Sequence, residues 1–464
     1  MIHSSRLRTL ADRPSPQRGR FVLYWMQRAQ RVGCNHALEF AVERANALGL
    51  PVLVGFGLMD DYPEANERHY AFMLEGLAGV ATDLTRRGIG FAVRHGRPDA
   101  AAIRLAAEGA ALLVCDRGYL RHEKAWRATV AESAGCPVVE VETDVVVPVE
   151  QASTKHEIGA RTLRPRIGRR LDEFLELLAK RAVKHRWRDD VGGGVSGDID
   201  VRDVDGALAR LKLDRGVGRV RRFRGGEREA QRLLRLFLKQ RLAEYEKKRS
   251  EPAAENTSTM SPYLHFGQIS PLDIALQVRA ATAADGTAGA YLEELIVRRE
   301  LAMNFVAFNP DYDRWESVPA WARKTLDAHR GDARPHLYGE EQLVRAETHD
   351  PYWNAATKEM TLTGYMHNYM RMYWGKKILE WSPDPAEAFR RTLALNNRFF
   401  LDGRDANSFA NVGWVFGLHD RPWTERPIFG NVRYMNAKGL ERKFDIRAYV
   451  DQVERIERGL EKKP

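Results

Sequence analysis

The segment from residue 352 to residue 381 is rich in aromatic side chains, and indoles spaced along a helix can pass electrons. Trp374, Ile378 and Trp381 follow an i, i+4, i+7 spacing. We therefore expect them on one helical face about 10 Å long, at a rise of ~1.5 Å per residue. Core packing is the commoner role of such a stripe. The alternative is a relay of oxidisable indoles that leads to a redox cofactor, and the spacing alone does not decide between the two.

Two other motifs carry groups suited to phosphate or proton chemistry. Residues 256–267, NTSTMSPYLHFG, place hydroxyls ahead of Pro262 and the start of a predicted helix. Hydroxyls and free N–H groups at a helix start can bind phosphate, although a simple N-cap is the commoner role. Glu294 and Arg298 follow an i, i+4 spacing. This spacing fits either a surface ion pair or a carboxyl held in apolar surroundings, where it stays protonated and can donate a hydrogen bond.

The elements that must position these groups begin with an alternating pattern in the first third of the chain. Short apolar runs predict strands at 21–26, 51–57, 89–94, 111–115 and 137–141, and amphipathic segments predict helices at 35–48, 66–87, 98–108 and 121–133. This order predicts a doubly wound, Rossmann-like parallel sheet with helices on both faces. Ligands of such sheets bind at the carboxyl ends of the strands, so the loops after Met26 and Gly57 are the expected small-molecule site.

The second half of the chain has a different pattern, with helical periodicity and almost no strand signal. Helices are expected at 227–248, 271–284, 288–308, 355–379 and 385–397. Residues 154–178 predict a basic connector that leads into a helix, and 191–197 (VGGGVSG) have linker composition. We therefore expect an N-terminal extension at 1–19, an α/β domain at 20–150, a linker at 151–226 and an all-α domain at 227–464.

Composition limits the classes of function. The chain is 44% hydrophobic and 29% charged, which is typical of a folded globular protein. Its net charge of +10 favours an anionic partner such as nucleic acid. The three cysteines lack C-x-x-C spacing, and no apolar run approaches the ~18 residues of a membrane helix. We therefore expect no metal site, no membrane insertion and a cytoplasmic location.

Taken together, the motifs resemble those of the class II cyclobutane pyrimidine dimer photolyases, in the photolyase/cryptochrome superfamily. The matching segments span nearly the whole chain: FVLYWMQ at 21–27, residues 57–77, MSPYLHFGQIS at 260–270, EELIVRREL at 293–301, THDPYWNA at 348–355, RMYWGKKILEW at 371–381 and LDGRD at 401–405. The resemblance implies an α/β antenna domain joined to an all-α FAD domain. It also implies light-driven repair of UV-damaged DNA, in which excited, fully reduced FAD passes an electron to a flipped-out dimer, the ring splits and the electron returns.

The resemblance also assigns roles to single residues. Glu294 matches the carboxyl that hydrogen-bonds the dimer, Asn396 matches the amide that faces flavin N5, and Met372 matches a lesion contact. The electron-transfer tryptophans are matched by Trp353, Trp374 and Trp381, with Trp374 nearest the flavin. FAD contacts are implied for Tyr245, Thr257, Ser258, Thr259, Ser261, Arg371, Asp402 and Asp405. DNA contacts are implied for Arg249, Arg298, Trp414 and Arg433.

The family often carries an antenna chromophore such as 8-hydroxy-5-deazaflavin in the α/β domain, and a monomer is sufficient to repair one lesion. A cryptochrome-like blue-light photoreceptor on the same fold is the main alternative. A flavin-free DNA-binding protein is a further alternative, against which the presence of Glu294, Asn396 and the tryptophans argues.

Overall fold

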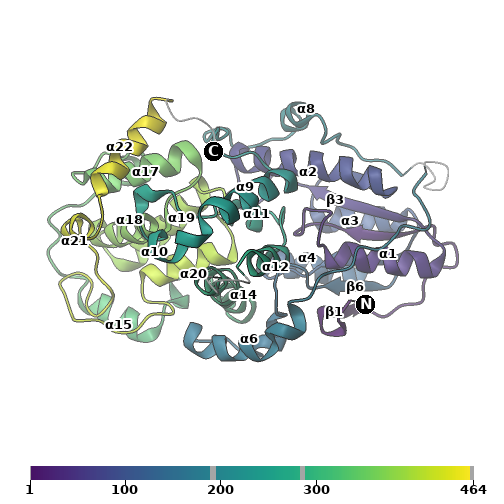
Figure 1. The fold of residues 1–464 in the computed structure, drawn as a ribbon, viewed down its shortest axis with the longest axis horizontal. Helices are drawn as coiled ribbons and strands as arrows, with labels where there is room; N and C mark the ends of the chain where they lie inside the picture. The colour runs from purple at the N-terminus through teal and green to yellow at the C-terminus, as the bar shows by residue number, and fades with distance from the viewer. Residues whose placement is uncertain (1, 189–194, 283–287, 460–464) are drawn as a thin grey trace.

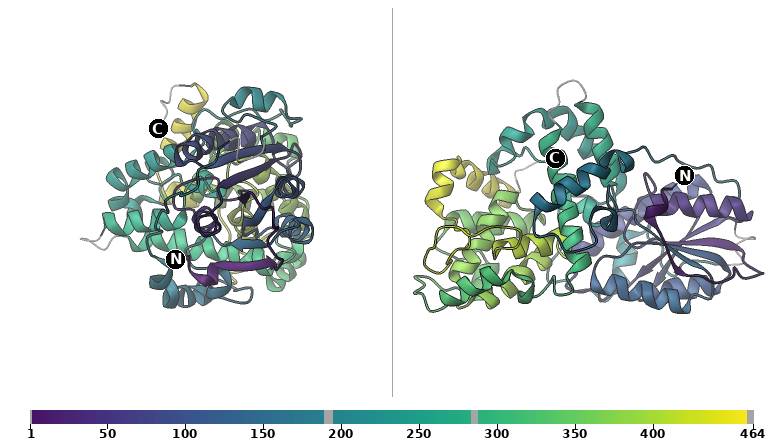
Figure 2. Two further views of the ribbon diagram at one scale, coloured as in Figure 1. Left: turned by 90° about the vertical axis from the view of Figure 1, so that its right-hand side faces the viewer. Right: turned by 90° about the horizontal axis from the view of Figure 1, so that it is seen from below.

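Residues 2–188, 195–282 and 288–459 are described by the computed structural model, which has two lobes (Figure 1). One lobe contains the sheet and the other contains only helices, and the view from below in Figure 2 shows the two side by side. This arrangement confirms the predicted fold class. Part of the predicted flexible linker, 191–194, lies outside the described residues.

The sheet has six strands in the order β1-β6-β5-β2-β3-β4. The strands are β1 (Leu7–Ala11), β2 (Phe21–Trp25), β3 (Val52–Leu58), β4 (Gly90–His95), β5 (Ala110–Asp116) and β6 (Val138–Val141). All neighbours pair in parallel except β1, which runs antiparallel to β6. Every residue of β2, β3 and β5 is buried, which explains their nearly continuous apolar sequences. The half-exposed edge strand β1 lacks that signal and lies within the expected N-terminal extension, 1–19, where no strand was predicted.

Helices cover both faces of the sheet, as predicted. They are α1 (His36–Leu48), α2 (Glu67–Arg87), α3 (Pro98–Ala107) and α4 (Arg121–Ser133). One apolar cluster joins α1 and α2 to the strands, and a second joins α3 and α4 to the strands. Asn35 caps α1 by accepting a hydrogen bond from the backbone N–H of Leu38, and Gly49 ends the helix at a φ of 69°.

The segment between the lobes and the helical lobe contain the remaining helices. The connecting segment has α5 (Val149–Ala152), α6 (Ala160–Phe174) and α8 (Val204–Ala209). The helical lobe has α9 (Glu227–Gln240), α10 (Tyr245–Lys248), α11 (Ser261–His265), α12 (Pro271–Ala281), α13 (Gly289–Leu292), a π-helical turn (Glu293–Arg298), α14 (Arg299–Phe308), α15 (Ala320–Ala328), α16 (Glu340–Val344), α17 (Pro351–Thr363), α18 (Asn368–Trp381), α19 (Pro385–Phe399), α20 (Ala406–Val415), α21 (Ala437–Lys443) and α22 (Ile446–Glu457).

Two of the predicted helices are broken in the structure. The expected helix at 355–379 is divided into α17 and α18. Gly364 adopts a φ of 71°, which ends α17 and turns the backbone before α18 begins. A Cβ at this position would lie 2.8 Å from Leu401 Cγ, so both the backbone and the packing require glycine. The expected helix at 227–248 is interrupted after Gln240. The interruption separates α9 from α10, which carries Tyr245.

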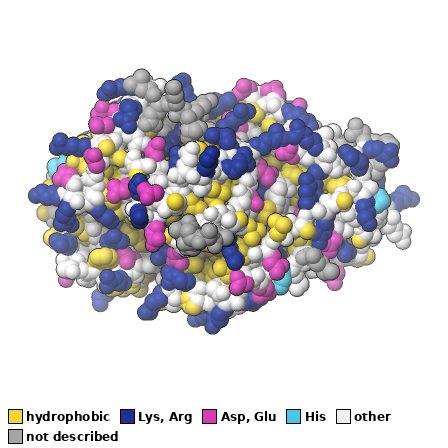
Figure 3. All heavy atoms as spheres, viewed as in Figure 1, with side chains coloured by type: hydrophobic (Ala, Val, Ile, Leu, Met, Phe, Trp, Pro, Cys, Tyr) yellow, Lys and Arg dark blue, Asp and Glu magenta, His cyan; other side chains and the backbone are white. Residues whose placement is uncertain are grey.

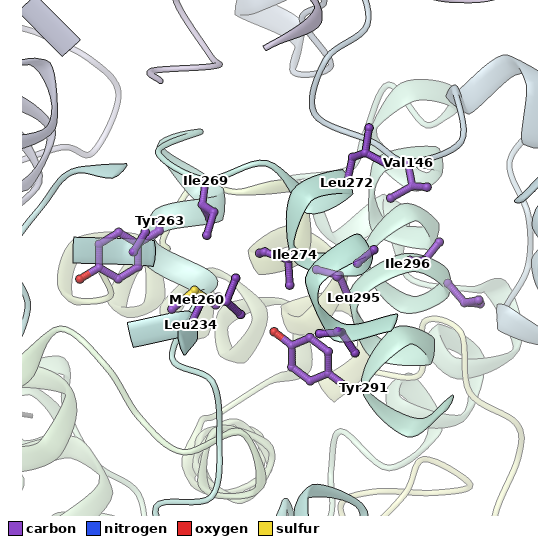
Figure 4. Packing of buried hydrophobic residues seen from close by; sticks show 14 of the residues in the cluster. Val146, Leu234, Met260, Tyr263, Ile269, Leu272, Ile274, Tyr291, Leu295 and Ile296 are labelled. Carbon is purple, nitrogen blue, oxygen red and sulfur yellow. The ribbon is translucent and has the colours of Figure 1, made fainter. Parts of the chain in front are cut away.

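The largest apolar cluster includes Met260 of the hydroxyl-rich turn at 256–261 (Figure 4). It joins α9, α11, α12 and the π-helical turn to Val146, at the end of the sheet lobe. Tyr291, whose ring belongs to this cluster, is labelled in Figure 4 near Leu295. The core therefore includes a side chain of the turn and continues into the segment that leads from the sheet.

The N-terminal end of α2 fixes the sheet lobe to the helical lobe. Arg68 donates from Nη1 to the carbonyl oxygens of Phe399 at 2.7 Å and Met360 at 3.2 Å. Asn66 Nδ2 donates to the carbonyl oxygen of Arg398 at 2.8 Å. These oxygens lie in the last turns of α17 and α19, at the helix ends that attract positive charge. The two lobes are thus joined by directional bonds.

Candidate functional site

A pocket opens in the helical lobe beside the hydroxyl-rich turn. Thr257 and Thr259 line it from the turn, Tyr365 and His367 line it from the loop between α17 and α18, and Arg241 adds a positive charge. Thr257 Oγ1 lies 3.0 Å from Tyr365 Oη, which links the two walls. Thr259 has a φ of 56°, a conformation that β-branched residues rarely adopt. Hydroxyls therefore converge on this cavity together with two guanidinium groups, Arg222 and Arg241, and two carboxylates, Glu255 and Glu359.

The other hydroxyl predictions extend the same wall. Ser258 Oγ accepts a hydrogen bond from Tyr291 Oη at 3.0 Å. The Tyr291 ring packs edge-on against Tyr245 at 5.2 Å between centroids, and the Arg249 guanidinium lies 5.8 Å from the Tyr245 ring. Ser261 is the first residue of α11. The structure thus brings Tyr245, Thr257 and Ser258 into one connected group.

Arg371 and Asp402 form a second polar element of the site. The Arg371 guanidinium donates to both carboxylate oxygens of Asp402, at 3.0 and 3.1 Å, and lies 4.0 Å from the centre of the Phe400 ring. Asp405 has other partners: it accepts from the Asn407 backbone N–H at 2.9 Å and from His265 at 3.2 Å. Burial disfavours the charge of Asp405, but the hydrogen bond and positive charge of His265 lower its pKa below the ordinary value.

Asn396 is buried near the end of α19, and its amide is oriented by a network that crosses to the sheet lobe. Asn396 Nδ2 donates to Asn397 Oδ1 at 3.0 Å. The same oxygen accepts from the backbone N–H of Arg404 at 2.9 Å, and Asn397 Nδ2 donates to Glu64 Oε2 at 2.5 Å. Sequence reasoning missed the bridging role of Asn397, whose partner Glu64 is distant in the chain.

The three predicted tryptophans form a continuous group of indoles. Trp374 packs edge-on against Phe400 at 6.2 Å and stacks on Trp353 at 6.4 Å with an interplanar angle of 8°. Trp353 meets Trp381 edge-on at 5.4 Å. The Nε1 of Trp353 donates to the carbonyl of Trp374 at 3.0 Å, and the Nε1 of Trp374 donates to Thr357 Oγ1 at 3.1 Å. The helical face predicted for Trp374 and Trp381 is buried, and Trp353 of α17 lies between them.

Glu294 and Arg298 do not pair with each other, because they lie in a π-helical turn. Residues five apart are neighbours in a π-helix, and Arg298 accordingly lies 3.3 Å from Glu293. Glu294 Oε1 accepts from Arg249 at 2.7 Å, and both side chains are 37% exposed. The expected desolvated carboxyl is therefore not found: Glu294 is ion-paired and accessible to solvent. Single π-helical turns occur often at functional sites.

Trp414 and Arg433, two of the expected DNA contacts, lie together in the structure. The Arg433 guanidinium is 5.5 Å from the Trp414 ring and 5.0 Å from the Trp423 ring. The Lys376 ammonium lies 5.1 Å from Trp414, and burial lowers the pKa of Lys376 to about 7. Sequence reasoning missed Lys376 and Trp423. Trp423 is 39% exposed and lies in a loop between Arg421 and Arg426. A tryptophan between two arginines in a loop is a sequence signal by which this residue could have been found.

Met372, the expected lesion contact, is half-buried in α18 and packs against the cluster that contains the tryptophans.

The face seen in Figure 3 carries many Lys and Arg side chains, with hydrophobic side chains exposed towards its middle.

No helix among the described residues has the length and apolar character that a membrane span requires. Within the same residues, no cluster of three or more His, Cys, Asp or Glu side chains is arranged to hold a metal ion.

A second cavity lies between the lobes at the carboxyl ends of β2 and β3. Gln27 and Met59 line it from the loops that follow these strands, and His265 and Arg404 line it from the helical lobe. This is the position that the strand order predicted for a small-molecule site. Whether a ligand binds there stays a prediction.

Comparison with known proteins identifies the family. Residues 22–184 match the model of the DNA photolyase family. The deoxyribodipyrimidine photo-lyase of Methanothermobacter thermautotrophicus is 48% identical, over 98% of this chain and 99% of that protein. The deoxyribodipyrimidine photo-lyase of Oryza sativa subsp. japonica is 39% identical, over 94% and 88%.

Solved structures share the fold at lower identity. A class III photolyase from Agrobacterium tumefaciens superposes with a TM-score of 0.70 at 20% identity, over 95% of this chain and 87% of that one. A Synechocystis cryptochrome gives a TM-score of 0.70 at 16% identity, over 94% and 90%. Because the relative from Methanothermobacter thermautotrophicus is 48% identical over nearly the whole chain, the chain belongs to the DNA photolyase family.

Proposed function

We propose that this protein is a class II photolyase, an enzyme that uses light to split cyclobutane pyrimidine dimers in UV-damaged DNA. The observation that carries the proposal is the continuous group of Trp374, Trp353 and Trp381. It begins at Phe400, whose ring the Arg371 guanidinium covers, and so starts beside the polar wall of the site. Buried indoles in this arrangement fit electron transfer to a redox cofactor.

The residues around the first cavity fit FAD. Thr257 and Thr259 line the cavity with hydroxyls and Arg241 lines it with a guanidinium, groups that suit the phosphate oxygens of a dinucleotide. The neighbouring Ser258, which accepts from Tyr291, adds a further hydroxyl beside this wall. When bound in its fully reduced form, FAD supplies the light absorption and the electron that splits the dimer. Asn396, with its amide held by Asn397, offers a carboxamide oxygen suited to accept from a flavin N–H and so to favour the reduced form.

The lesion would lie at the surface where Glu294 and Arg249 pair. In our proposal Arg249 turns to a DNA phosphate when DNA binds, and the dimer covers Glu294, which then gains a proton and hydrogen-bonds a pyrimidine carbonyl. Trp414 and Met372 would contact the flipped bases. Arg298 and Arg433 would meet phosphates, which makes DNA binding weaken as salt rises.

We further propose that the second cavity holds an antenna chromophore such as 8-hydroxy-5-deazaflavin. Its walls support this, since Trp126, Tyr62 and Phe266 offer flat apolar surfaces and Gln27 and Arg404 offer polar ones. The absorption spectrum of the purified protein tests this proposal. We also propose that the enzyme is a monomer, which light scattering after gel filtration tests.

Repair of a thymine-dimer oligonucleotide tests the main proposal. The purified protein, chemically reduced, is illuminated with blue light, with a dark sample as the control. Light-dependent recovery of intact thymines would support the proposal. If FAD is bound and reduced but no repair occurs, the proposal is wrong and a photoreceptor function gains weight.

A further inference from the structure

The aromatic path does not end at Trp381, because Tyr338 and His349 continue it to the surface. The Tyr338 ring meets Trp381 edge-on at 5.2 Å between centroids, and the His349 ring lies 5.3 Å from Trp381. His349 in turn stacks on His336 at 3.8 Å. Trp381 is buried, Tyr338 is half-buried and both histidines are exposed. Aromatic rings in contact with one another therefore connect Trp381 to the solvent-exposed surface, and an oxidised Trp381 can take an electron along this path.

The hydrogen bonds of the Tyr338 phenol point its proton at His349. The phenol oxygen accepts from the backbone N–H of His349 at 3.0 Å. It also lies 2.6 Å from Nδ1 of the same histidine. Because the backbone N–H occupies an acceptor position of the phenol, the O–H is available to donate to Nδ1. Tyr338 is held in place by its own backbone N–H, which donates to the carbonyl of Trp381 at 3.3 Å.

We propose that Tyr338 is the terminal electron donor of the tryptophan relay and that His349 accepts the phenol proton. This inference rests on the proposed relay and extends it by one residue. Its chemistry uses only side chains of this chain and a soluble reductant.

The step balances in electrons and protons. An indole radical cation at Trp381, formed when its electron moves inward through Trp353, takes one electron from Tyr338. The phenol O–H bond breaks, the proton moves to Nδ1 of neutral His349, and Tyr338 becomes a neutral phenoxyl radical. A thiolate in solution then gives one electron to the phenoxyl and becomes a thiyl radical, while the proton returns from His349 to the phenol oxygen. Separating the proton from the electron prevents the charge from recombining inward.

Several charged and titratable groups surround His349 and set its proton affinity. They are Tyr338 and His336 on the segment before α16, Asp350 at the start of α17, and Lys377 and Glu380 on α18. Burial and the neighbouring His336 lower the pKa of His349 below its ordinary value. The ring is therefore neutral at pH 7 and able to accept the proton. As pH falls through its pKa, His349 gains a proton from solvent and the phenoxyl yield should fall.

Transient absorption and electron paramagnetic resonance after a light pulse test the proposal in the flavin-loaded protein. In the wild type the tryptophan radical signal should decay as a phenoxyl signal grows. Tyr338→Phe should abolish the phenoxyl signal and lengthen the tryptophan radical lifetime. His349→Phe should slow phenoxyl formation by about 100-fold, the low end of what a positioned proton acceptor contributes. Tyr352→Phe is the matched control, since Tyr352 bonds Glu441 and should leave both signals unchanged.

A dark measurement does not depend on the cofactor. In ¹⁵N spectra of labelled histidine, His349 should carry its proton on Nε2 and leave Nδ1 as the acceptor. A proton on Nδ1 would overturn the proposal, because the phenol would then have no acceptor.

The outcomes separate this inference from the relay. If the wild type forms no tryptophan radical, the proposed relay itself is wrong. If the tryptophan radical forms and decays without a phenoxyl signal, or if Tyr338→Phe leaves the phenoxyl signal intact, the relay stands and the role of Tyr338 is wrong.

Discussion

Replacing Arg371 by methionine should destabilise the helical lobe by about 3 kcal/mol, since breaking a buried ion pair costs about 3–5 kcal/mol and this one is partly exposed. Arg371 contacts both carboxylate oxygens of Asp402, at 3.0 and 3.1 Å, and the two side chains are only 18% and 10% exposed. The variant leaves the Asp402 charge without its partner. It also removes the guanidinium from the Phe400 ring, a contact worth about 0.5–1 kcal/mol.

Urea unfolding followed by tryptophan fluorescence measures this change, because Trp353 and Trp374 report on the same lobe and urea does not screen charges. Arg390→Met is the matched control. Arg390 is 57% exposed in its pair with Glu387, so its loss should cost less than about 1 kcal/mol. A double variant, Arg371→Met with Asp402→Leu, should recover most of the stability, since no unpaired charge remains. The reasoning is refuted if Arg371→Met costs no more than Arg390→Met, or if the double variant is as unstable as the single one.

Three other predictions follow from the site. Trp374→Phe should block photoreduction of bound FAD but spare repair when the flavin is reduced chemically; loss of both activities in the same assays would contradict the relay. Asn396→Leu should bind FAD, yet its reduced flavin should reoxidise in air faster than that of the wild type, which absorbance after reduction measures. Burial lowers the pKa of Lys376 to about 7 from 10.5. Between these values the unfolded chain binds more protons, so the free energy of unfolding should rise with pH. The free energy of unfolding, measured by urea titration at pH 7 and about pH 9, should therefore increase less in Lys376→Met than in the wild type.

The sequence predicted the elements whose burial is uniform or strictly periodic. The fully buried β2, β3 and β5 and the amphipathic α4 were found within a residue or two. The edge strand β1 was missed because half-exposed residues with a central arginine and threonine look like loop. The break at Gly364 was missed because apolar periodicity continues across it, and only the packing of Leu401 shows why a turn is needed there.

The candidate site was predictable as a set of residues but not as a geometry. The spacing of Trp374 and Trp381 placed both on one face of α18, whereas the position of Trp353 depends on how α17 packs against it. The pairing of Glu294 with Arg249 depends on a π-helical turn, for which the i, i+4 pattern gives no signal. Contacts between distant segments, such as Asn397 with Glu64, leave no trace in local periodicity.

The bonds from Arg68 and Asn66 to the last turns of α17 and α19 also have an optical consequence. Resonance transfer of excitation between two pigments depends steeply on their separation and on the angle between their transition dipoles. A pigment in the cavity between the lobes would be held by the same framework that holds a flavin in the helical lobe. Directional bonds at this interface would keep this separation and this angle constant. The rate of excitation transfer from the pigment to the flavin would then be nearly the same in every molecule.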